Sequence, residues 1–406
     1  MHHVRARALR SQLWTWGVRN LEVADVYKKI LLITNDFGPR TGGIETFVIG
    51  LLERISGHKI IVLTSQQGDT SEYDRHWLEK YGVQVIRDRS KILLPSWRVT
   101  RSAKKIAQHH NVDVVVFGAA APLALMAPAL RNSGVQKIIA LTHGHEVWWA
   151  KIFPFNIAMK RIGNGVDHLT YLGEFTRKAI SQSLSHNSAH SMVKIAPGID
   201  TSHFTPRKDS MQKRIELGLE NKKIIICVGR LVHRKGQDRL IEALPQILKE
   251  IPNAHLLIVG DGPYKAYLEK LVDKLDLKED VTFVGRVLYE KLPNFLSAAD
   301  VFAMPSRSRF FGLEVEGLGI VYLEASACGL PVIAGNSGGA PDAVREGITG
   351  LCVDGTDVKQ IAEAVIHICS DSLRASEMGS AGRNWIVEQW RWEIWSKEFN
   401  ALLVSQ

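Results

Sequence analysis

A short run of β-branched residues, a glycine-containing turn and an amphipathic helix follow one another repeatedly along this chain. Strands that alternate with helices form a parallel sheet covered by helices on both faces. The pattern therefore predicts the α/β class. The predicted strands are residues 30–34, 60–64, 83–87, 112–117 and 138–142 in the first half, and 223–228, 255–259, 281–284, 301–304 and 331–334 in the second.

The alternation is interrupted between residues 196 and 213, where the segment contains two prolines and lacks a clear periodicity. A chain of 406 residues also exceeds what one hydrophobic core usually organises. We expect two doubly wound domains, residues 28–200 and 201–385, that face each other across a cleft. Such folds bind ligands at the carboxyl ends of their strands, so the cleft is the expected site.

Both ends of the chain fall outside this pattern. Residues 1–27 match nothing downstream, and we interpret them as an extension, with a misassigned start and a true beginning near Val26 as one hypothesis. Four tryptophans at positions 385, 390, 392 and 395 must largely be covered. We expect residues 386–406 to form a helix that packs back on the first domain; a membrane-facing aromatic surface is the alternative.

The basic charge of the chain is confined to its first half. Residues 1–200 contain 26 Lys and Arg against 15 Asp and Glu, whereas residues 201–406 contain 25 against 27. Such a surface suits an anionic partner, for example phospholipid headgroups, although a merely solvated basic surface is the alternative. Because no nucleic-acid-binding motif accompanies the charge, no nucleic acid partner is expected.

Targeting and redox signals point to the cytoplasm. No apolar run reaches the roughly 20 residues of a membrane span, and residues 1–27 lack the apolar core of a signal peptide. The four cysteines form no C-x-x-C pair, which is typical of reduced thiols in a cytoplasmic protein.

Two glycines precede the first helix of the first domain. The predicted strand 30–34 runs into the sequence NDFGPRTGGIET, and Gly42 and Gly43 would let the backbone approach a phosphate beside the helix N-terminus. The pattern is neither a Walker A motif nor G-x-G-x-x-G, so an ordinary tight turn remains the alternative.

The second domain begins with a strand followed by two cations. Arg230 and Lys235 would lie at the carboxyl end of that strand and could converge on one diphosphate. Two cations there would stabilise a departing nucleoside diphosphate. A solvated basic loop is the alternative.

Two carboxylates flank a glycine-rich turn later in this domain. Glu316 is expected at the mouth of an apolar helix and Glu324 about two turns along the same face. The two could accept hydrogen bonds from separate sets of sugar hydroxyls, and Glu314 is a competing carboxylate.

These features occur together with other short sequence motifs, and the motifs follow one another along the chain in the same order as in one enzyme family. They are Pro197-Gly198-Ile199-Asp200, Gly229-Arg230 with Lys235-Gly236, Gly260-Asp261-Gly262-Pro263, Glu316-x7-Glu324 and Gly338-Gly339-Ala340-Pro341. From about Lys28 to its end, the chain resembles retaining family-4 glycosyltransferases. The resemblance implies the GT-B fold, two Rossmann-like domains facing across a cleft.

The resemblance also implies roles for individual residues. Gly42 and Gly43 would face the donor phosphates, Arg230 and Lys235 would bind the diphosphate, and Glu324 would bind the ribose hydroxyls. The transferred sugar would be held by Glu316, by the backbone of Gly317, Leu318, Gly319 and Ile320, and by His143, while the role of His145 stays open. Val287 lies in segment 285–291, where related enzymes contact the nucleobase, and Glu290 could replace an acidic residue of guanine-specific relatives.

The implied chemistry retains the anomeric configuration and needs no cofactor. Because no D-x-D tripeptide occurs in the sequence, no metal site is expected, and the cations and the helix end would take the place of a metal.

Within the family, residues 34–46 and 316–324 are most similar to actinobacterial phosphatidylinositol mannosyltransferases. The subgroup that adds the second, α-1,6-linked mannose uses GDP-mannose and a phosphatidylinositol monomannoside. A lipid acceptor fits the cations and apolar residues of segment 87–110 and the aromatic residues of segment 147–157, and implies peripheral contact with the inner face of the plasma membrane. Those aromatic residues could equally belong to the core.

Two other functions remain open. One is a GT-B glycosyltransferase that uses another nucleotide sugar and a soluble or polymer acceptor. The second is an inactive scaffold that binds a sugar nucleotide or associates with a membrane.

Overall fold

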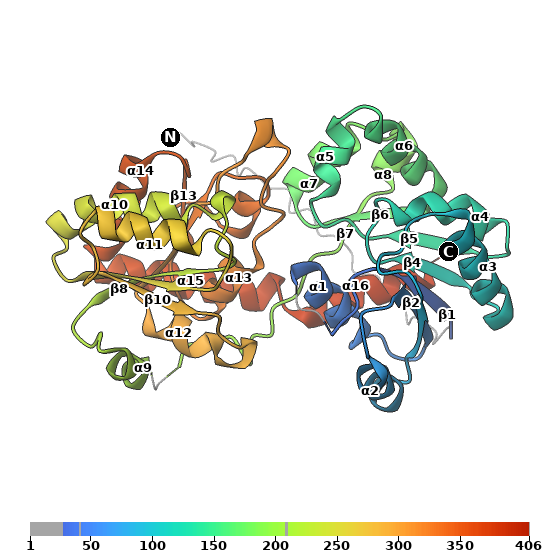
Figure 1. Cartoon of the computed structure of the whole chain (residues 1–406), viewed down its shortest axis with the longest axis horizontal. Helices are drawn as coiled ribbons and strands as arrows, with labels where there is room; N and C mark the ends of the chain where they lie inside the picture. Colours follow the sequence, from blue (N-terminus) through green and yellow to red (C-terminus); the bar gives the residue numbers. More distant parts are fainter. Residues whose placement is uncertain (1–26, 40–41, 208–209, 406) are drawn as a thin grey trace, which may run out of the picture.

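The computed structural model describes residues 27–39, 42–207 and 210–405, which form two α/β domains lying side by side (Figure 1). The interpretation of residues 1–27 therefore concerns a segment that, apart from Tyr27, lies outside the described residues. None of the described helices is both long enough and apolar enough to cross a bilayer.

The first domain is built on a seven-stranded parallel sheet with the order β3-β2-β1-β4-β5-β6-β7. Every residue of β4 and β5 is buried, as expected for central strands covered on both faces. The strands are β1 (Lys29–Ile33), β2 (Lys59–Ser65), β3 (Gln84–Asp88), β4 (Val114–Phe117), β5 (Lys137–Ala140), β6 (His168–Tyr171) and β7 (Val193–Lys194).

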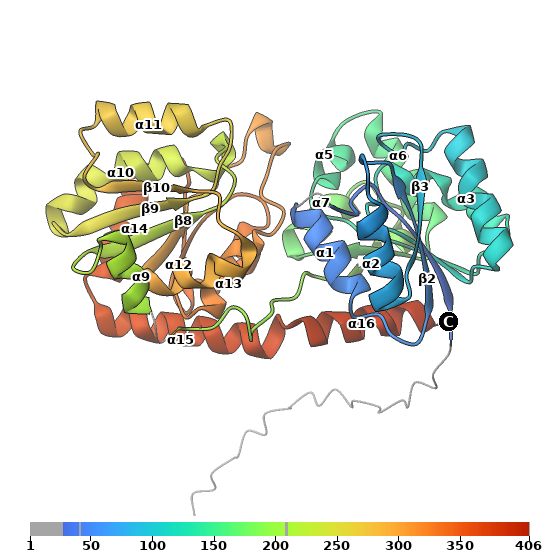
Figure 2. The same ribbon diagram turned by 60° about the horizontal axis from the view of Figure 1, so that its bottom comes forward.

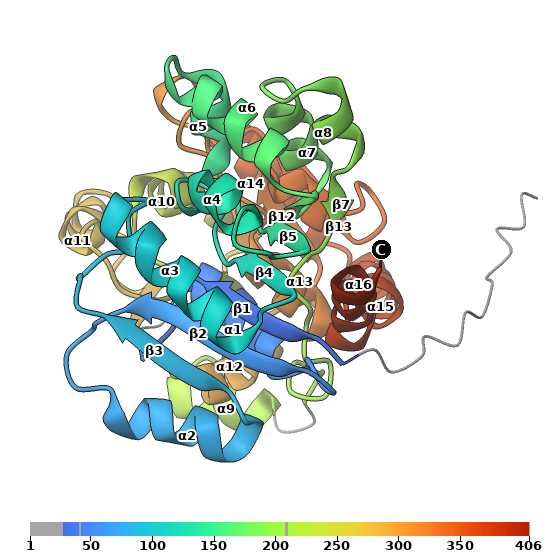
Figure 3. The same cartoon turned by 90° about the vertical axis from the view of Figure 1, so that its right-hand side faces the viewer.

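Alternate residues along these strands enter two different cores. Ile30, Leu32 and Val116 pack with α1 and α16, whereas Leu31 and Val115 pack with α3 on the opposite face (Figure 3). The helices of this domain are α1 (Gly43–Leu52), α2 (Ser71–Tyr81), α3 (Trp97–His110), η1 (Leu123–Met126), α4 (Ala127–Arg131), α5 (Glu146–Lys151), α6 (Phe155–Gly165), α7 (Glu174–Ser181) and α8 (His186–His190).

The second domain is built on a six-stranded parallel sheet with the order β10-β9-β8-β11-β12-β13. Its strands are β8 (Lys223–Val228), β9 (Ala254–Val259), β10 (Val281–Gly285), β11 (Val301–Met304), β12 (Val332–Gly335) and β13 (Gly350–Val353). Its helices are α9 (Ser210–Leu217), η2 (His233–Lys235), α10 (Gln237–Glu250), α11 (Lys265–Lys274), η3 (Tyr289–Lys291), α12 (Leu292–Ala298), η4 (Phe310–Gly312), α13 (Ile320–Ala327), η5 (Ala340–Ala343), α14 (Val358–Cys369) and α15 (Ser372–Gln389). The α/β class and the doubly wound architecture are confirmed.

The last two helices run beneath both domains (Figure 2). The final helix, α16 (Trp392–Val404), lies against the first domain, where the Trp392 ring stacks on Phe47 with ring centroids 6.3 Å apart. Gly50 and Gly198 make this contact possible, because a Cβ at either position would lie within 2.4 Å of Trp392. The backbone N–H of Ile199 donates to the Trp390 carbonyl at 2.7 Å, so the segment that joins the domains is bound to the C-terminal helices.

Candidate active site

A pocket with a volume of about 870 Å³ lies between the two domains. Most of its walls come from the loops after β1 and β5 in the first domain and after β8 and β11 in the second, and Leu172, Pro197 and Tyr289 complete the lining. The strand order reverses at β1/β4 and at β8/β11, which is where open α/β sheets bind ligands. The pocket lining includes Gly42, Gly43, His143, Arg230, Lys235, Glu316, Gly317, Leu318, Gly319, Ile320 and Glu324.

Two glycines bring the backbones of the domains together beside this pocket. A Cβ at Gly144 would lie 2.8 Å from the Gly317 Cα, and a Cβ at Gly317 would lie 2.6 Å from the His143 carbonyl oxygen. Gly144 also has φ +101°, which a side chain rarely adopts. The loop after β5 and the loop after β11 can therefore meet here only if both residues are glycine.

The glycine pair of the first domain stands at the start of α1. Gly42 is the N-cap residue in an extended conformation, and Gly43 is the first helical residue, with open space where a Cβ would point. The free N–H groups and the positive dipole end of α1 consequently face the pocket. This arrangement suits an anionic group of a ligand.

Arg230 and Lys235 approach the pocket from the loop after β8. Arg230 is exposed, whereas Lys235 is buried in the short turn η2. Gly236 ends this turn with φ +76°, and a Cβ there would lie 2.0 Å from the Pro305 carbonyl oxygen. A glycine is therefore required to bring the turn against the loop after β11.

A buried ion pair supports the turn that carries Lys235. The Arg307 guanidinium donates to both carboxylate oxygens of Asp238, at 2.9 and 2.8 Å, and both residues are less than 5% exposed. The same guanidinium lies within 3.1 Å of His233 in η2. This bidentate ion pair, together with the contact to His233, fixes the orientation of η2.

Glu316 and Lys235 form an ion pair inside the pocket. The Lys235 Nζ lies 2.7 Å from Glu316 Oε2, and Glu316 is only 7% exposed. The Glu316 backbone is held by the Gly338-Gly339 segment, because the Gly339 N–H donates to its carbonyl at 2.8 Å. A diphosphate that drew Lys235 toward itself would leave Glu316 free to accept hydrogen bonds from sugar hydroxyls.

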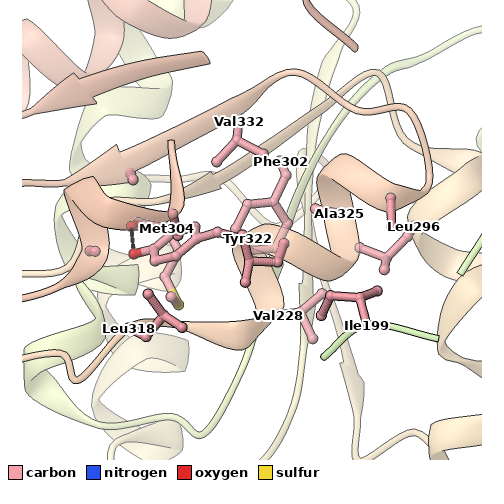
Figure 4. Packing of buried hydrophobic residues seen from close by; sticks show 14 of the residues in the cluster. Ile199, Val228, Leu296, Phe302, Met304, Leu318, Tyr322, Ala325 and Val332 are labelled. Atoms are coloured by element: carbon pink, nitrogen blue, oxygen red, sulfur yellow. Dashed lines mark hydrogen bonds between the residues drawn. The ribbon is translucent and has the colours of Figure 1, made fainter. Parts of the chain in front are cut away.

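Helix α13 positions the second carboxylate. It is anchored by Tyr322, whose buried hydroxyl donates to the Met304 carbonyl at 2.8 Å and whose ring meets the edge of Phe302 (Figure 4). Glu324 therefore faces the pocket from a fixed helix, and burial raises its pKa to about 7.

His143 is held in one protonation state by its surroundings. Burial is the main cause that lowers its pKa, so the ring is neutral at pH 7. Its Nε2 lies 2.5 Å from the Gly118 carbonyl oxygen, which only a protonated nitrogen can approach, so Nδ1 is left as an acceptor. His145 also lines the pocket, 3.3 Å from the buried carboxylate of Glu146.

The segment predicted to contact the nucleobase, residues 285–291, reaches the pocket lining with Tyr289. Val287 lies outside the pocket lining and packs against the core, whereas Tyr289, two residues later, lines the pocket and stacks on His203. Arg234, Phe47 and Trp148 also line the pocket and were not predicted as donor-site residues. They lie in loops or on helix faces, where the spacing of residues in the sequence does not indicate a ligand-binding role.

The basic segment 87–110 is partly used within the fold. Arg87 pairs with Asp74 and Arg98 with Asp88, both at 2.7 Å. The residues of this segment that remain exposed include Arg89, Lys91, Arg101 and Lys105, beside the exposed side chains of Ile92, Leu94 and Trp97. In segment 147–157, Trp148, Trp149 and Phe155 contact one another, while Phe153 is 75% exposed.

Comparison with known proteins identifies the family of the chain. Residues 41–203 match the model of the Glycosyltransferase Family 4 domain, and residues 209–385 match that of Glycosyl transferases group 1. Among solved structures, Anabaena HepE in complex with UDP has a TM-score of 0.77 at 20% identity and covers 93% of this chain and all of its own. Sucrose-phosphate synthase of Thermosynechococcus elongatus has the same TM-score at 24% identity and covers 92% of this chain and 98% of its own.

Two curated relatives are much closer in sequence. The GDP-mannose-dependent α-(1-6)-phosphatidylinositol monomannoside mannosyltransferase of Mycolicibacterium smegmatis is 43% identical over 89% of this chain and 95% of its own length. A GDP-mannose-dependent monoacylated α-(1-6)-phosphatidylinositol monomannoside mannosyltransferase of Corynebacterium glutamicum is 41% identical over 93% of this chain and 98% of its own. The chain is therefore a GT-B enzyme and belongs to the glycosyltransferase family that contains these mannosyltransferases.

Proposed function

We propose that this enzyme transfers mannose from GDP-mannose to a phosphatidylinositol monomannoside, forming an α-1,6 linkage. The observation that carries the proposal is the pocket in which Arg230, Lys235, Glu316 and Glu324 converge. The sugar and the acceptor rest on the relatives that are 41 to 43% identical over most of the chain.

The donor would lie across the pocket between the two domains. The α1 N-terminus at Gly42 and Gly43, together with Arg230 and Lys235, would hold the diphosphate and stabilise the charge that develops as it leaves. Glu324 would accept hydrogen bonds from the ribose hydroxyls. Glu316 and the backbone from Gly317 to Ile320 would hold mannose.

The reaction would retain the configuration at the anomeric carbon. The bond from that carbon to the diphosphate oxygen breaks while a bond to the acceptor oxygen forms on the same face. The acceptor proton passes to the departing phosphate. His143, with Nδ1 free to accept, would orient a hydroxyl of the transferred sugar.

The acceptor would be reached at an anionic membrane. The exposed cations and apolar side chains between Arg89 and Lys105 support contact of the first domain with anionic lipid at the inner face of the plasma membrane.

The test is transfer by the purified protein from a panel of GDP- and UDP-sugars to phosphatidylinositol and its monomannoside in detergent. We expect mannose transfer from GDP-mannose to the monomannoside. Glu316→Ala should abolish the transfer, whereas Glu377→Ala, at an exposed position of α15, should leave it unchanged.

Other outcomes separate the alternatives. Use of a UDP-sugar with a soluble acceptor would keep the enzyme class and overturn the lipid acceptor. Binding of GDP without turnover of any donor would indicate the inactive scaffold.

A further inference from the structure

Two phenylalanines project from a loop beside the pocket. The Phe310–Phe311 loop, residues Arg309–Glu314, lies between β11 and α13; Phe310 is 62% exposed and Phe311 is fully exposed. Loop tips usually carry small polar residues, so two exposed aromatic rings at this place call for a partner.

The loop has a fixed and strained shape. The Arg309 N–H donates to the Glu314 carbonyl at 2.9 Å and closes its base. Phe310, Phe311 and Gly312 follow one another with φ of +49°, +55° and +80°, a conformation that phenylalanine rarely adopts. This backbone turns both rings outward, away from the core of the second domain. Leu313 and Glu314 of the same loop line the pocket.

The first domain meets this loop with an apolar and basic segment. The Lys151 Nζ donates to the Gly312 carbonyl at 3.1 Å, and Figures 1 and 2 show the loop beside α5. Just beyond Lys151, Phe153 is 75% exposed and Ile157 is 44% exposed. Lys160 and Arg161 are also exposed and share the α6 face of Ile157, because residues three and four apart are neighbours on a helix.

Charge favours an anionic lipid as the partner. Residues 147–166 contain three cations, Lys151, Lys160 and Arg161, and neither Asp nor Glu. Exposed aromatic rings with cations at their border are typical of surfaces that rest in the headgroup region of a bilayer. A protein partner would call for directional polar groups in addition to these rings.

We propose that the Phe310–Phe311 loop of the second domain inserts into an anionic bilayer together with the Phe153–Arg161 segment of the first. Both domains would then contact the lipid, on either side of the pocket entrance. The inference rests on the proposed function in that the acceptor carries acyl chains: the loop would contact the chains while the acceptor headgroup enters the pocket.

The test is sedimentation of the full chain with vesicles of phosphatidylcholine containing phosphatidylinositol, without any sugar donor or acceptor. F310S/F311S should weaken the partition by about tenfold, because two aromatic side chains no longer enter the apolar layer. F153S should weaken it to a smaller extent. Leu373→Ser is the matched control, because Leu373 is 78% exposed at the start of α15, on no part of this surface.

GDP binding, measured for each variant, shows that the pocket has folded. Equal partition of the wild type, F310S/F311S and F153S would overturn the inference, and so would an equal loss in Leu373→Ser. Because this measurement contains no donor, its result is independent of whether mannose is transferred. With an active enzyme, F310S/F311S should raise the KM for the acylated monomannoside and leave the KM for its deacylated, water-soluble form unchanged.

Discussion

Lys235 and Glu316 come from loops after different strands, β8 and β11, and meet as an ion pair with Nζ and Oε2 2.7 Å apart. In the proposed reaction, Lys235 would bind the diphosphate and Glu316 would bind the sugar, and the ion pair neutralises both charges in the ligand-free protein. Removing one partner leaves the other charge buried without compensation.

Lys235→Met is therefore expected to lower turnover of the donor by about 100-fold or more, since the leaving diphosphate loses a buried cation. Lys270→Met, at an exposed position of α11, is the control. The measurement is steady-state release of GDP with acceptor present. A fall of less than threefold in Lys235→Met would contradict the assigned role.

Glu324 predicts a pH dependence of donor binding. Its pKa is raised to about 7, so the carboxylate is largely protonated at pH 6 and largely ionised at pH 8. Ribose hydroxyls donate more strongly to the ionised form, so the affinity for GDP should rise across this range and then level off. Glu324→Gln should bind GDP weakly with little change between pH 6 and pH 8; titration calorimetry measures both.

Glu324 also predicts that the stability of the folded protein falls with rising pH, whereas the affinity for GDP rises. Because the pKa of Glu324 in the folded protein lies above its ordinary value of 4.5, the folded protein favours the protonated form, and stability is lost as pH rises toward and through about 7. Glu324→Gln should consequently stabilise the ligand-free protein at pH 8, by on the order of 1–3 kcal/mol, and change little at pH 4.5. Urea unfolding at the two pH values tests this; equal effects at both would count against it.

Arg307→Met should unfold more easily than the wild type, by about 3–5 kcal/mol, because Asp238 would remain buried without its partner. The double variant R307M/D238N should recover part of this loss. Urea unfolding gives the free energies, and a loss below about 1 kcal/mol in the single variant would show that the pair is dispensable.

A substitution at Trp392 tests the contact between α16 and the first domain. Trp392→Ala removes the ring between Phe47, Gly50 and Gly198 and should cost about 3–5 kcal/mol of unfolding free energy. Trp97→Ala is the matched control, since Trp97 is 76% exposed and its loss should cost no more than about 0.5 kcal/mol.

Activity is expected to persist in EDTA, because in the proposed complex Arg230, Lys235 and the α1 N-terminus would supply the positive charge around the diphosphate. The rate of transfer is measured before and after chelation. Complete loss in EDTA that magnesium or manganese reverses would show that a metal takes part.

Sequence patterns predicted the central strands of both sheets but missed strands at or next to a sheet edge. Strands β8 and β11 lie at the predicted residues 223–228 and 301–304, because continuous apolar runs identify buried central strands. Strands β6, β7 and β13 were not predicted. β6 mixes polar with apolar residues and β7 has two residues, so neighbouring strands rather than local pattern define them.

The candidate-site residues were predictable where they belong to short sequence motifs, and close backbone approach requires glycine at two of them, Gly236 and Gly317. Glycines at 42, 43, 236 and 317 and the carboxylates at 316 and 324 stand in recognisable phrases. The Lys235–Glu316 pair and the place of Tyr289 were not predictable, because they arise when loops after different strands meet in space.

The position of α16 has a consequence for biosynthesis. Phe399 of this helix packs over Ile30, Leu32 and Val48 of the first domain. While the ribosome is still making the second domain, that apolar face has no cover. The first domain thus completes its core only when α16 leaves the exit tunnel, so folding of the N-terminal half ends after, and not before, translation of the second domain.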